Sequence, residues 1–408
     1  MTKDKVFITW VTLVPVFSIL MDLGMNFIPE LKLVIGLVRI TFLVGLVLFF
    51  LNSYPLYRTV LNQLILFFAI YLLAISLLSS NLKVSFVDGA IKTSIPFFMI
   101  PIGILASKMH KNLLIKPMIW VIIILLINYL FSQFYKLGVS IYEKDSFYKG
   151  GATASAPIII ALILIIIFHT FNKKKLPYNR IIITIIVSLA LFVIIFSLKR
   201  GAILALISAA LTYLFFTGKR TRTILRFVLV GLIMAFILNN NIESFYKRIE
   251  SRTTERNELQ NEGRYKEIFY IFQEFENSNP AKIIFGTEPF NSDEIMAKYF
   301  GRKRRLHVDY NILLHGTGIF GLSIYLMIFF NLLKTAIKLK LKSIKTTSEY
   351  SSKENFALVV SILILSLIMG FSGGLQFISY RVILFLAIGY YLGLSIYYKP
   401  NYLELKVN

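Results

Sequence analysis

Cysteine is absent from this chain of 408 residues, and acidic residues are scarce, with 21 Asp and Glu against 44 Lys and Arg. Without cysteine the chain can form neither a disulfide framework nor a cysteine-ligated metal site. It also lacks the glycine-rich phosphate loop, the dinucleotide fingerprint and the His-Glu-x-x-His zinc pattern, which argues against a nucleotide-driven pump. Charged residues make up only 16% of the chain, too little polar surface to cover a soluble globule.

Hydrophobic residues make up 57% of the sequence and gather in long runs. A run of about 20 residues crosses a hydrocarbon core of about 30 Å as an α-helix and is too long for a transmembrane strand. The sequence therefore predicts an all-α fold, a polytopic transmembrane helical bundle of about 12 spans. The predicted spans are 6–23, 31–51, 60–78, 91–107, 113–132, 154–171, 181–197, 201–217, 225–239, 311–333, 356–371 and 381–398.

The net charge of +23 is distributed in short basic clusters between these runs. The connections assigned to the inside carry 22 Lys or Arg, whereas the short connections on the other side carry nine. By the positive-inside rule both termini are predicted to be cytoplasmic. The basic excess is thus a topology signal, and a nucleic-acid partner is not expected because no single soluble face collects the charge.

One segment differs from all the others in polarity. Residues 240–309 contain twelve Lys or Arg and twelve Asp or Glu, more than half of all the acidic residues. Long loops are exempt from the positive-inside rule, so this segment can lie outside the cell membrane. We divide the chain into spans one to nine (1–239), a large extracytoplasmic loop (240–310), spans ten to twelve (311–398) and a cytoplasmic tail (399–408).

Part of the large loop has helical periodicity. Tyr265, Ile268, Phe269, Phe272 and Phe275 recur at the spacing of one helix face. This pattern predicts an amphipathic helix that packs against the bundle or lies on the membrane.

Several cations could form an anion site at the outer face. Lys199 and Arg200 join two spans with almost no loop, on the side that disfavours positive charge, and guanidinium binds phosphate in a bidentate manner. Arg264, Arg302 and Arg305 lie in the large loop and could complete a basic cavity suited to a diphosphate. There is an alternative for each group of cations. The Lys199 and Arg200 side chains can extend to the membrane–water interface, and residues 302–305 can contact anionic lipid headgroups.

His307 is the one histidine of the large loop and stands where the chain re-enters the bilayer. An imidazole titrates near neutral pH and can take a proton from a sugar hydroxyl, although a lone histidine is more often structural. Small residues at Gly316, Gly318 and Gly321 predict close packing at the start of the next span. The remaining histidines, His110, His169 and His315, are assigned structural roles.

Taken in order, these motifs resemble the superfamily of bacterial O-antigen polymerases and O-antigen ligases. The resemblance covers about residues 180–335. It consists of Arg200-Gly201 opening a span, Gly263-Arg264 in the loop, and His307 followed by Gly318-Ile-Phe-Gly321.

Two positions depart from the usual pattern of this superfamily. Lys199 replaces the usual Ser or Thr, and Val308 replaces the polar residue that ligases carry after the histidine. His307-Val-Asp309-Tyr310 is closer to the His-x-Asp-Tyr of the polysaccharide polymerases.

The resemblance implies an enzyme of the bacterial inner membrane that transfers a glycan from undecaprenyl diphosphate at the outer face. It implies catalytic roles for His307, Arg200 and Arg264, with no metal and no cofactor. Expected partners are the lipid-linked oligosaccharide, membrane lipid, a chain-length regulator and a flippase. The residues expected to contact substrate are Lys199, Arg302, Arg305, Asp309 and Tyr310.

Three functions remain open at this point. The first is a polymerase that extends the non-reducing end of another lipid-linked repeat unit. The second is a ligase that transfers the glycan to lipid A-core or another terminal acceptor. The third is a flippase, which is expected to place charges deep within several spans, whereas Arg39 is the main such charge in the sequence.

Overall fold

The computed structural model of the 408-residue chain describes residues 2–55, 59–135, 155–172, 176–197, 199–218, 263–301, 303, 305–344, 349–374 and 377–397, and in these ranges helices are joined by turns and short irregular segments. Regular structure in these ranges comprises 14 α-helices, a 3₁₀ turn (Pro29–Leu31) and a π-helix (Lys83–Ile91). The α-helices are α1 (Lys3–Phe27), α2 (Lys32–Ser53), α3 (Val60–Ser76), α4 (Lys92–Met109), α5 (Ile115–Tyr135), α6 (Ala156–Asn172), α7 (Arg180–Phe196), α8 (Arg200–Thr217), α11 (Gly263–Glu276), α12 (Pro280–Phe285), α13 (Asp293–Phe300), α14 (Asp309–Ile344), α15 (Glu349–Gly370) and α16 (Ile378–Tyr397).

Eight helical segments in the described part of the chain are long and apolar enough to cross a membrane. They comprise α1, the π-helix with α4, α5, α8, α14, α15, α16, and α2 with the 3₁₀ turn that precedes it. The predicted all-α, multi-pass architecture is confirmed to that extent. Shorter apolar helices α3, α6 and α7 coincide with three more predicted spans, whereas the predicted span 225–239 lies outside the described residues. The total of twelve therefore stays a prediction.

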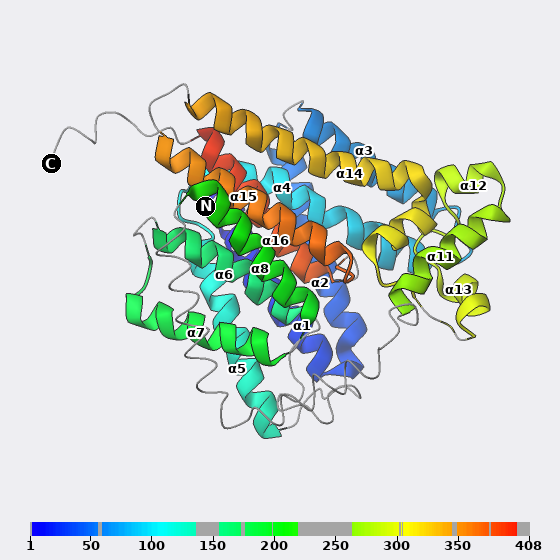
Figure 1. Cartoon of the computed structure of the whole chain (residues 1–408), viewed down its shortest axis with the longest axis horizontal. Helices are drawn as coiled ribbons and strands as arrows, with labels where there is room; N and C mark the ends of the chain where they lie inside the picture. Colours follow the sequence, from blue (N-terminus) through cyan, green and yellow to red (C-terminus); the bar gives the residue numbers. More distant parts are fainter. Residues whose placement is uncertain are drawn as a thin grey trace.

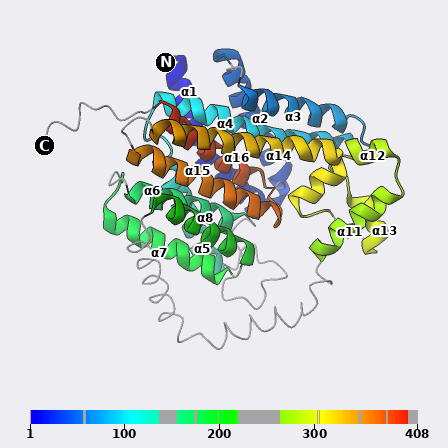
Figure 2. The same ribbon diagram turned by 45° about the horizontal axis from the view of Figure 1, so that its top comes forward.

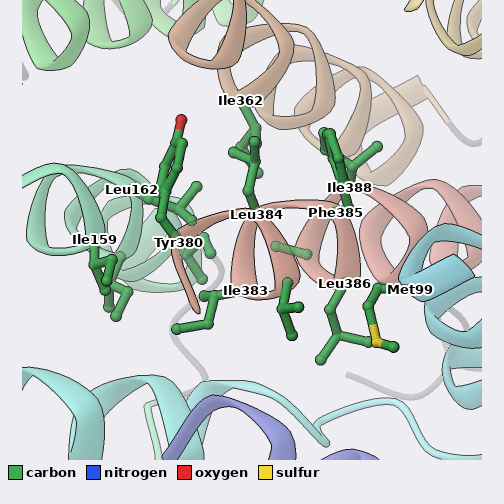
Figure 3. Close-up of a cluster of buried hydrophobic side chains, with 14 of the residues drawn as sticks. Met99, Ile159, Leu162, Ile362, Tyr380, Ile383, Leu384, Phe385, Leu386 and Ile388 are labelled. Atoms are coloured by element: carbon green, nitrogen blue, oxygen red, sulfur yellow. The ribbon is translucent and has the colours of Figure 1, made fainter. Parts of the chain in front are cut away.

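Helix α16 forms the centre of the bundle. Every residue from Ile378 to Gly393 is buried, so this helix has neither a solvent-facing nor a lipid-facing side along four turns. Figure 3 shows its side chains directed to opposite sides, toward Met99 of α4, Ile362 of α15 and the isoleucine-rich α6. A helix that is buried on every side must be surrounded by other helices, and α16 packs against α4, α15 and α6.

The α4 and α16 backbones approach closely because glycine lies at their crossing. A Cβ added at Gly389 would lie 2.0 Å from the carbonyl oxygen of Ile100, and one at Gly103 would lie 2.5 Å from that of Leu386. Small residues allow this contact between membrane helices, where dispersion rather than exclusion of water stabilises packing.

The outer helices expose apolar side chains instead of burying them. On α2, Leu33, Val34, Leu37 and Leu48 are each more than half exposed. An apolar surface of this extent is unusual on a soluble monomer and suits contact with lipid. The structure thus supports a multi-pass membrane protein from its surface as well as from its helix lengths.

Helices α11, α12 and α13 form a compact unit, here called the cap (263–301). Figures 1 and 2 both show the cap at one end of the bundle, beside the start of α14. Its interior contains Ile271, Phe275 and Met296 together with Leu306 and Leu314. The predicted amphipathic helix is therefore present as α11, with Phe275 buried but Phe269 and Phe272 exposed.

The membrane orientation can be tested directly because the chain has no cysteine of its own. Asn277 is exposed on the cap and Lys338 is exposed near the far end of α14. From the asymmetry of basic residues we expect a membrane-impermeant maleimide to label Asn277→Cys in intact spheroplasts. Lys338→Cys should be labelled only after permeabilisation. Labelling with the opposite pattern would show that the predicted orientation is inverted.

Candidate functional site

His307 lies on the short segment between α13 and α14, against the buried carboxylate of Glu267 from α11. The imidazole Nδ1 is 3.1 Å from Glu267 Oε1. The backbone N–H groups of His307 and Val308 donate to Glu267 Oε2 at 3.0 and 3.3 Å. The Glu267 side chain is fully buried, whereas the His307 side chain is 45% exposed. One carboxylate thus holds both the histidine ring and the backbone that leads into α14.

The ionised state of Glu267 determines which of the two His307 ring nitrogens carries the proton. Burial opposes ionisation of Glu267, but the hydrogen bonds from His307 and Val308 outweigh burial and hold its pKa below the ordinary value. An ionised carboxylate only accepts hydrogen bonds, so Nδ1 is the protonated nitrogen. In the neutral imidazole, Nε2 then holds the free lone pair and can accept a proton.

The next two residues fix the start of α14. Asp309 is only 4% exposed, and its Oδ1 accepts a 2.7 Å hydrogen bond from the Gly374 N–H. The Tyr310 hydroxyl donates to the Leu367 carbonyl at 2.8 Å. Both predicted substrate contacts therefore have partners within the fold, and a contact of either residue with substrate stays a prediction.

The turn that follows α15, residues 371–374, packs between His307 and the start of α8. A Cβ at Gly373, where φ is +88°, would lie 2.1 Å from the His307 carbonyl oxygen. A Cβ at Gly201 would lie 2.4 Å from Ser372 Oγ. Gly201 and the His307 carbonyl therefore lie against the same turn. The sequence motifs at these positions are 106 residues apart in the chain, and the structure brings them to one end of the bundle.

Lys199 and Arg200 stand at the N-terminus of α8, as the N-cap and the first helical residue. Arg200 is exposed and Lys199 is half-buried. The N-terminus of a helix carries partial positive charge and unpaired N–H groups, which suit an anion. The predicted anion site therefore has a helix terminus as well as two cationic side chains.

The other predicted cations belong to the cap. Arg264 is the second residue of α11, one turn before Glu267, and its side chain lies outside the described residues, as does Arg302. Arg305 pairs with Asp293 at 3.2 Å, with both side chains partly exposed. Such an exposed pair contributes little to stability. The predicted role of these arginines in substrate binding stays a prediction.

Arg381 is a buried cation in the first turn of α16. It is 2% exposed and lies inside the bundle, where Tyr325 is the first of the groups that interact with it. Its guanidinium carbon lies 5.3 Å from the centre of the Phe97 ring and 5.4 Å from that of Phe385. Asp309 is among the groups that interact with it electrostatically. Because a buried charge is costly, these ring faces and this carboxylate must offset the desolvation of Arg381.

The cap is joined to the bundle through a break in α14. Gly318 has φ +65° and ψ −171°, which is not helical. The nearby carbonyls of His315 and Thr317 accept hydrogen bonds from the Thr287 N–H (2.7 Å) and the Tyr71 hydroxyl (2.8 Å). The predicted close packing at the glycines is present, and its partner at Gly318 is the backbone of α12.

A second connection lies just beyond α12. Glu288 accepts hydrogen bonds from Ser79 Oγ at 2.8 Å and Ser80 Oγ at 3.0 Å, so it joins the cap to the loop before the π-helix. Burial opposes ionisation of Glu288, but these hydrogen bonds and that from Asn291 hold its pKa below the ordinary value. Glu288 also has a positive φ of +46°, which the surrounding contacts maintain.

Among the described residues, no group of three or more His, Asp or Glu could hold a metal ion. The comparisons add no relative: no protein-family model and no curated protein sequence matches this chain. The site is therefore interpreted from its own geometry.

Proposed function

We propose that this protein is a membrane glycosyltransferase of the polysaccharide polymerase type, with His307 as the general base. The observation that carries the proposal is the pair formed by Glu267 and His307 where the chain enters the bundle. A buried carboxylate fixes Nδ1 of a half-exposed imidazole and leaves Nε2 available, the arrangement by which a histidine is oriented for proton transfer.

In this reaction Nε2 of His307 removes the proton from an acceptor sugar hydroxyl. The oxygen forms a bond to the anomeric carbon of the donor sugar, and the bond from that carbon to the lipid diphosphate breaks. The diphosphate leaves with the bonding electron pair, so negative charge increases on it in the transition state. Preorganised cations stabilise a leaving group of this kind.

Arg200, Lys199 and the N-terminus of α8 are proposed to bind the diphosphate, with Arg264 completing the site. Support comes from the 371–374 turn, which touches both the α8 start and His307. The chemical energy resides in the donor diphosphate linkage, so the proposed reaction needs no nucleotide.

A transporter of lipid-linked glycan is the second candidate, and the buried charges favour it. Arg39 binds Asp22 and the Ser379 hydroxyl inside the bundle, and Arg381 is buried two residues further along α16. The bundle therefore buries two arginines, Arg39 and Arg381, whereas the sequence indicated mainly Arg39. Intramembrane charges often mark a transport pathway.

The decisive experiment uses the purified full chain in nanodiscs with repeat units linked to undecaprenyl diphosphate. A polymerase produces a ladder of longer glycans on one lipid carrier. A ligase produces transfer only when lipid A-core is added. A transporter moves the substrate across the bilayer of proteoliposomes without lengthening it, and that result would overturn our proposal.

The proposed diphosphate contact is tested by Arg200→Lys. Lysine keeps the charge but loses the bidentate geometry, so we expect the elongation rate to fall roughly ten-fold or more. The matched control is Arg180→Lys, because Arg180 is also exposed and also begins a helix, α7. Elongation by Arg180→Lys should be unchanged. An Arg200→Lys variant as active as the wild type would remove the bidentate contact from the mechanism.

A further inference from the structure

A pocket lies near the end of the bundle opposite the cap, and the proposed reaction does not use it. Its volume is about 410 Å³, within the range of small-molecule sites. It lies among α2, α3, α4, α14 and α16. Along α14 this pocket is about 25 residues beyond His307, or roughly 40 Å at the rise of a helix.

One face of α14 supplies the positive charge of this pocket. Asn331, Lys334, Thr335 and Lys338 recur at a spacing of three and four residues, and all four line the pocket. Both lysines are exposed, and no Asp or Glu occurs among the described residues that line the pocket. Lys108 increases the positive charge nearby, because its ammonium lies 5.6 Å from the ring centre of the pocket residue Tyr397.

The remaining walls are mostly apolar. They include Phe50, Leu61, Ile104 and Leu392, and Val60, which is 61% exposed, also lines the pocket. The pocket lies where α2 ends, α3 begins and α16 ends, the depth at which lipid headgroups meet a membrane helix. It therefore combines cations at headgroup depth with an apolar surface suited to acyl chains.

We infer that this pocket binds the headgroup of an anionic phospholipid. The two lysines contact the phosphate, the Asn331 and Thr335 side chains offer hydrogen bonds, and the acyl chains extend over the apolar walls. Basic pockets between membrane helices bind anionic headgroups in this way, each lysine adding to the affinity. A phospholipid fits better than a free phosphate because the greater part of the pocket wall is apolar.

The test is native mass spectrometry of the detergent-purified full chain. Dioleoylphosphatidylglycerol and dioleoylphosphatidylcholine have the same acyl chains, so only the headgroup differs. We expect retention of phosphatidylglycerol over phosphatidylcholine. The double variant Lys334→Gln/Lys338→Gln should bind phosphatidylglycerol roughly 30-fold more weakly.

Two control variants keep this test specific. Lys340 is two residues from Lys338 but lines a different, apolar groove, where its ammonium lies over the Phe356 ring. Lys340→Gln should bind phosphatidylglycerol as the wild type does. Lys338→Arg keeps the charge and should also retain the lipid, which separates loss of charge from loss of fold.

Three results would overturn this inference. They are equal retention of the two lipids by the wild type, full retention by the double variant, and displacement of phosphatidylglycerol by millimolar inorganic phosphate. None of them bears on glycan elongation, so this pocket and the proposed reaction can fail independently.

Discussion

Replacing His307 with alanine is expected to lower glycan elongation by a factor on the order of 10² to 10⁴, the usual cost of a lost general base. Donor binding should remain close to that of the wild type, because the proposed diphosphate contacts belong to α8 and the cap. The measurement is elongation of a lipid-linked repeat unit by purified protein, together with donor binding by the same preparation. A loss in turnover without a loss in binding is the signature of a group that acts on the acceptor.

Two further variants separate catalysis from packing. His307→Asn can keep a hydrogen bond from its side-chain amide to Glu267 but has no basic nitrogen, so it should be as inactive as His307→Ala. Glu267→Gln keeps the size of the side chain, but its single amide oxygen cannot accept both from the His307 ring and from the backbone N–H groups of His307 and Val308. The ring is then no longer held with its proton on Nδ1, and turnover should fall about 10- to 100-fold. His110→Ala, at the exposed C-terminal end of α4, is the histidine control and should remain active. Near-normal elongation by His307→Asn would exclude the proposed base.

The same carboxylate also has a consequence for stability. Because the pKa of Glu267 lies below its ordinary value of 4.5, the unfolded chain binds more protons than the folded chain as pH falls through that range. The stabilisation is fully present above pH 4.5 and is lost as the pH falls through the lowered folded pKa. Glu267→Gln should remove this part of the acid dependence of unfolding.

Helix positions were predictable because hydrophobic run length is a direct consequence of bilayer thickness. Each predicted span that lies in the described residues coincides with an apolar helix, and the α11 pattern also forms a helix. The sequence could not show that α16 is central, because a helix inside the bundle and a helix facing lipid are both apolar. Contact with other helices, rather than composition, distinguishes α16 from α2.

The candidate site was predictable only in part. His307 and Arg200 stood out as polar residues at helix starts, but Glu267 lies on the polar side of a helix that was recognised by its apolar stripe. Its burial depends on how the cap packs on α14, and nothing local in the sequence encodes that. Gly373 and Gly374 match no sequence motif either, because their contacts are made by the backbone. Gly373 leaves room for the His307 carbonyl oxygen, and the Gly374 N–H donates to Asp309.

Gly318→Ala is expected to detach the cap from the bundle. The backbone there has φ +65° with extended ψ, a conformation almost restricted to glycine that costs other residues about 1–3 kcal/mol. A Cβ would also lie 2.2 Å from the Ile284 carbonyl oxygen and 2.6 Å from the Gly286 nitrogen, which are backbone atoms that cannot rotate away. Overpacking adds about 1–3 kcal/mol. Together the two effects should lower the free energy of unfolding by about 4 kcal/mol. This loss should be seen as a lower midpoint temperature of thermal unfolding in detergent.

The control for this change is Gly301→Ala at the end of α13. Gly301 has nearly the same φ, +67°, but nothing lies within 4 Å of the Cβ it would gain. Its cost should be limited to backbone strain, about 1 kcal/mol. Glu267 belongs to the cap, and His307 directly precedes α14. Detaching the cap therefore separates the two residues, so elongation should be lost in Gly318→Ala and kept in Gly301→Ala. If the two variants unfold at the same temperature, then α12 does not pack into the α14 break, and the contact that places Glu267 beside His307 must lie elsewhere.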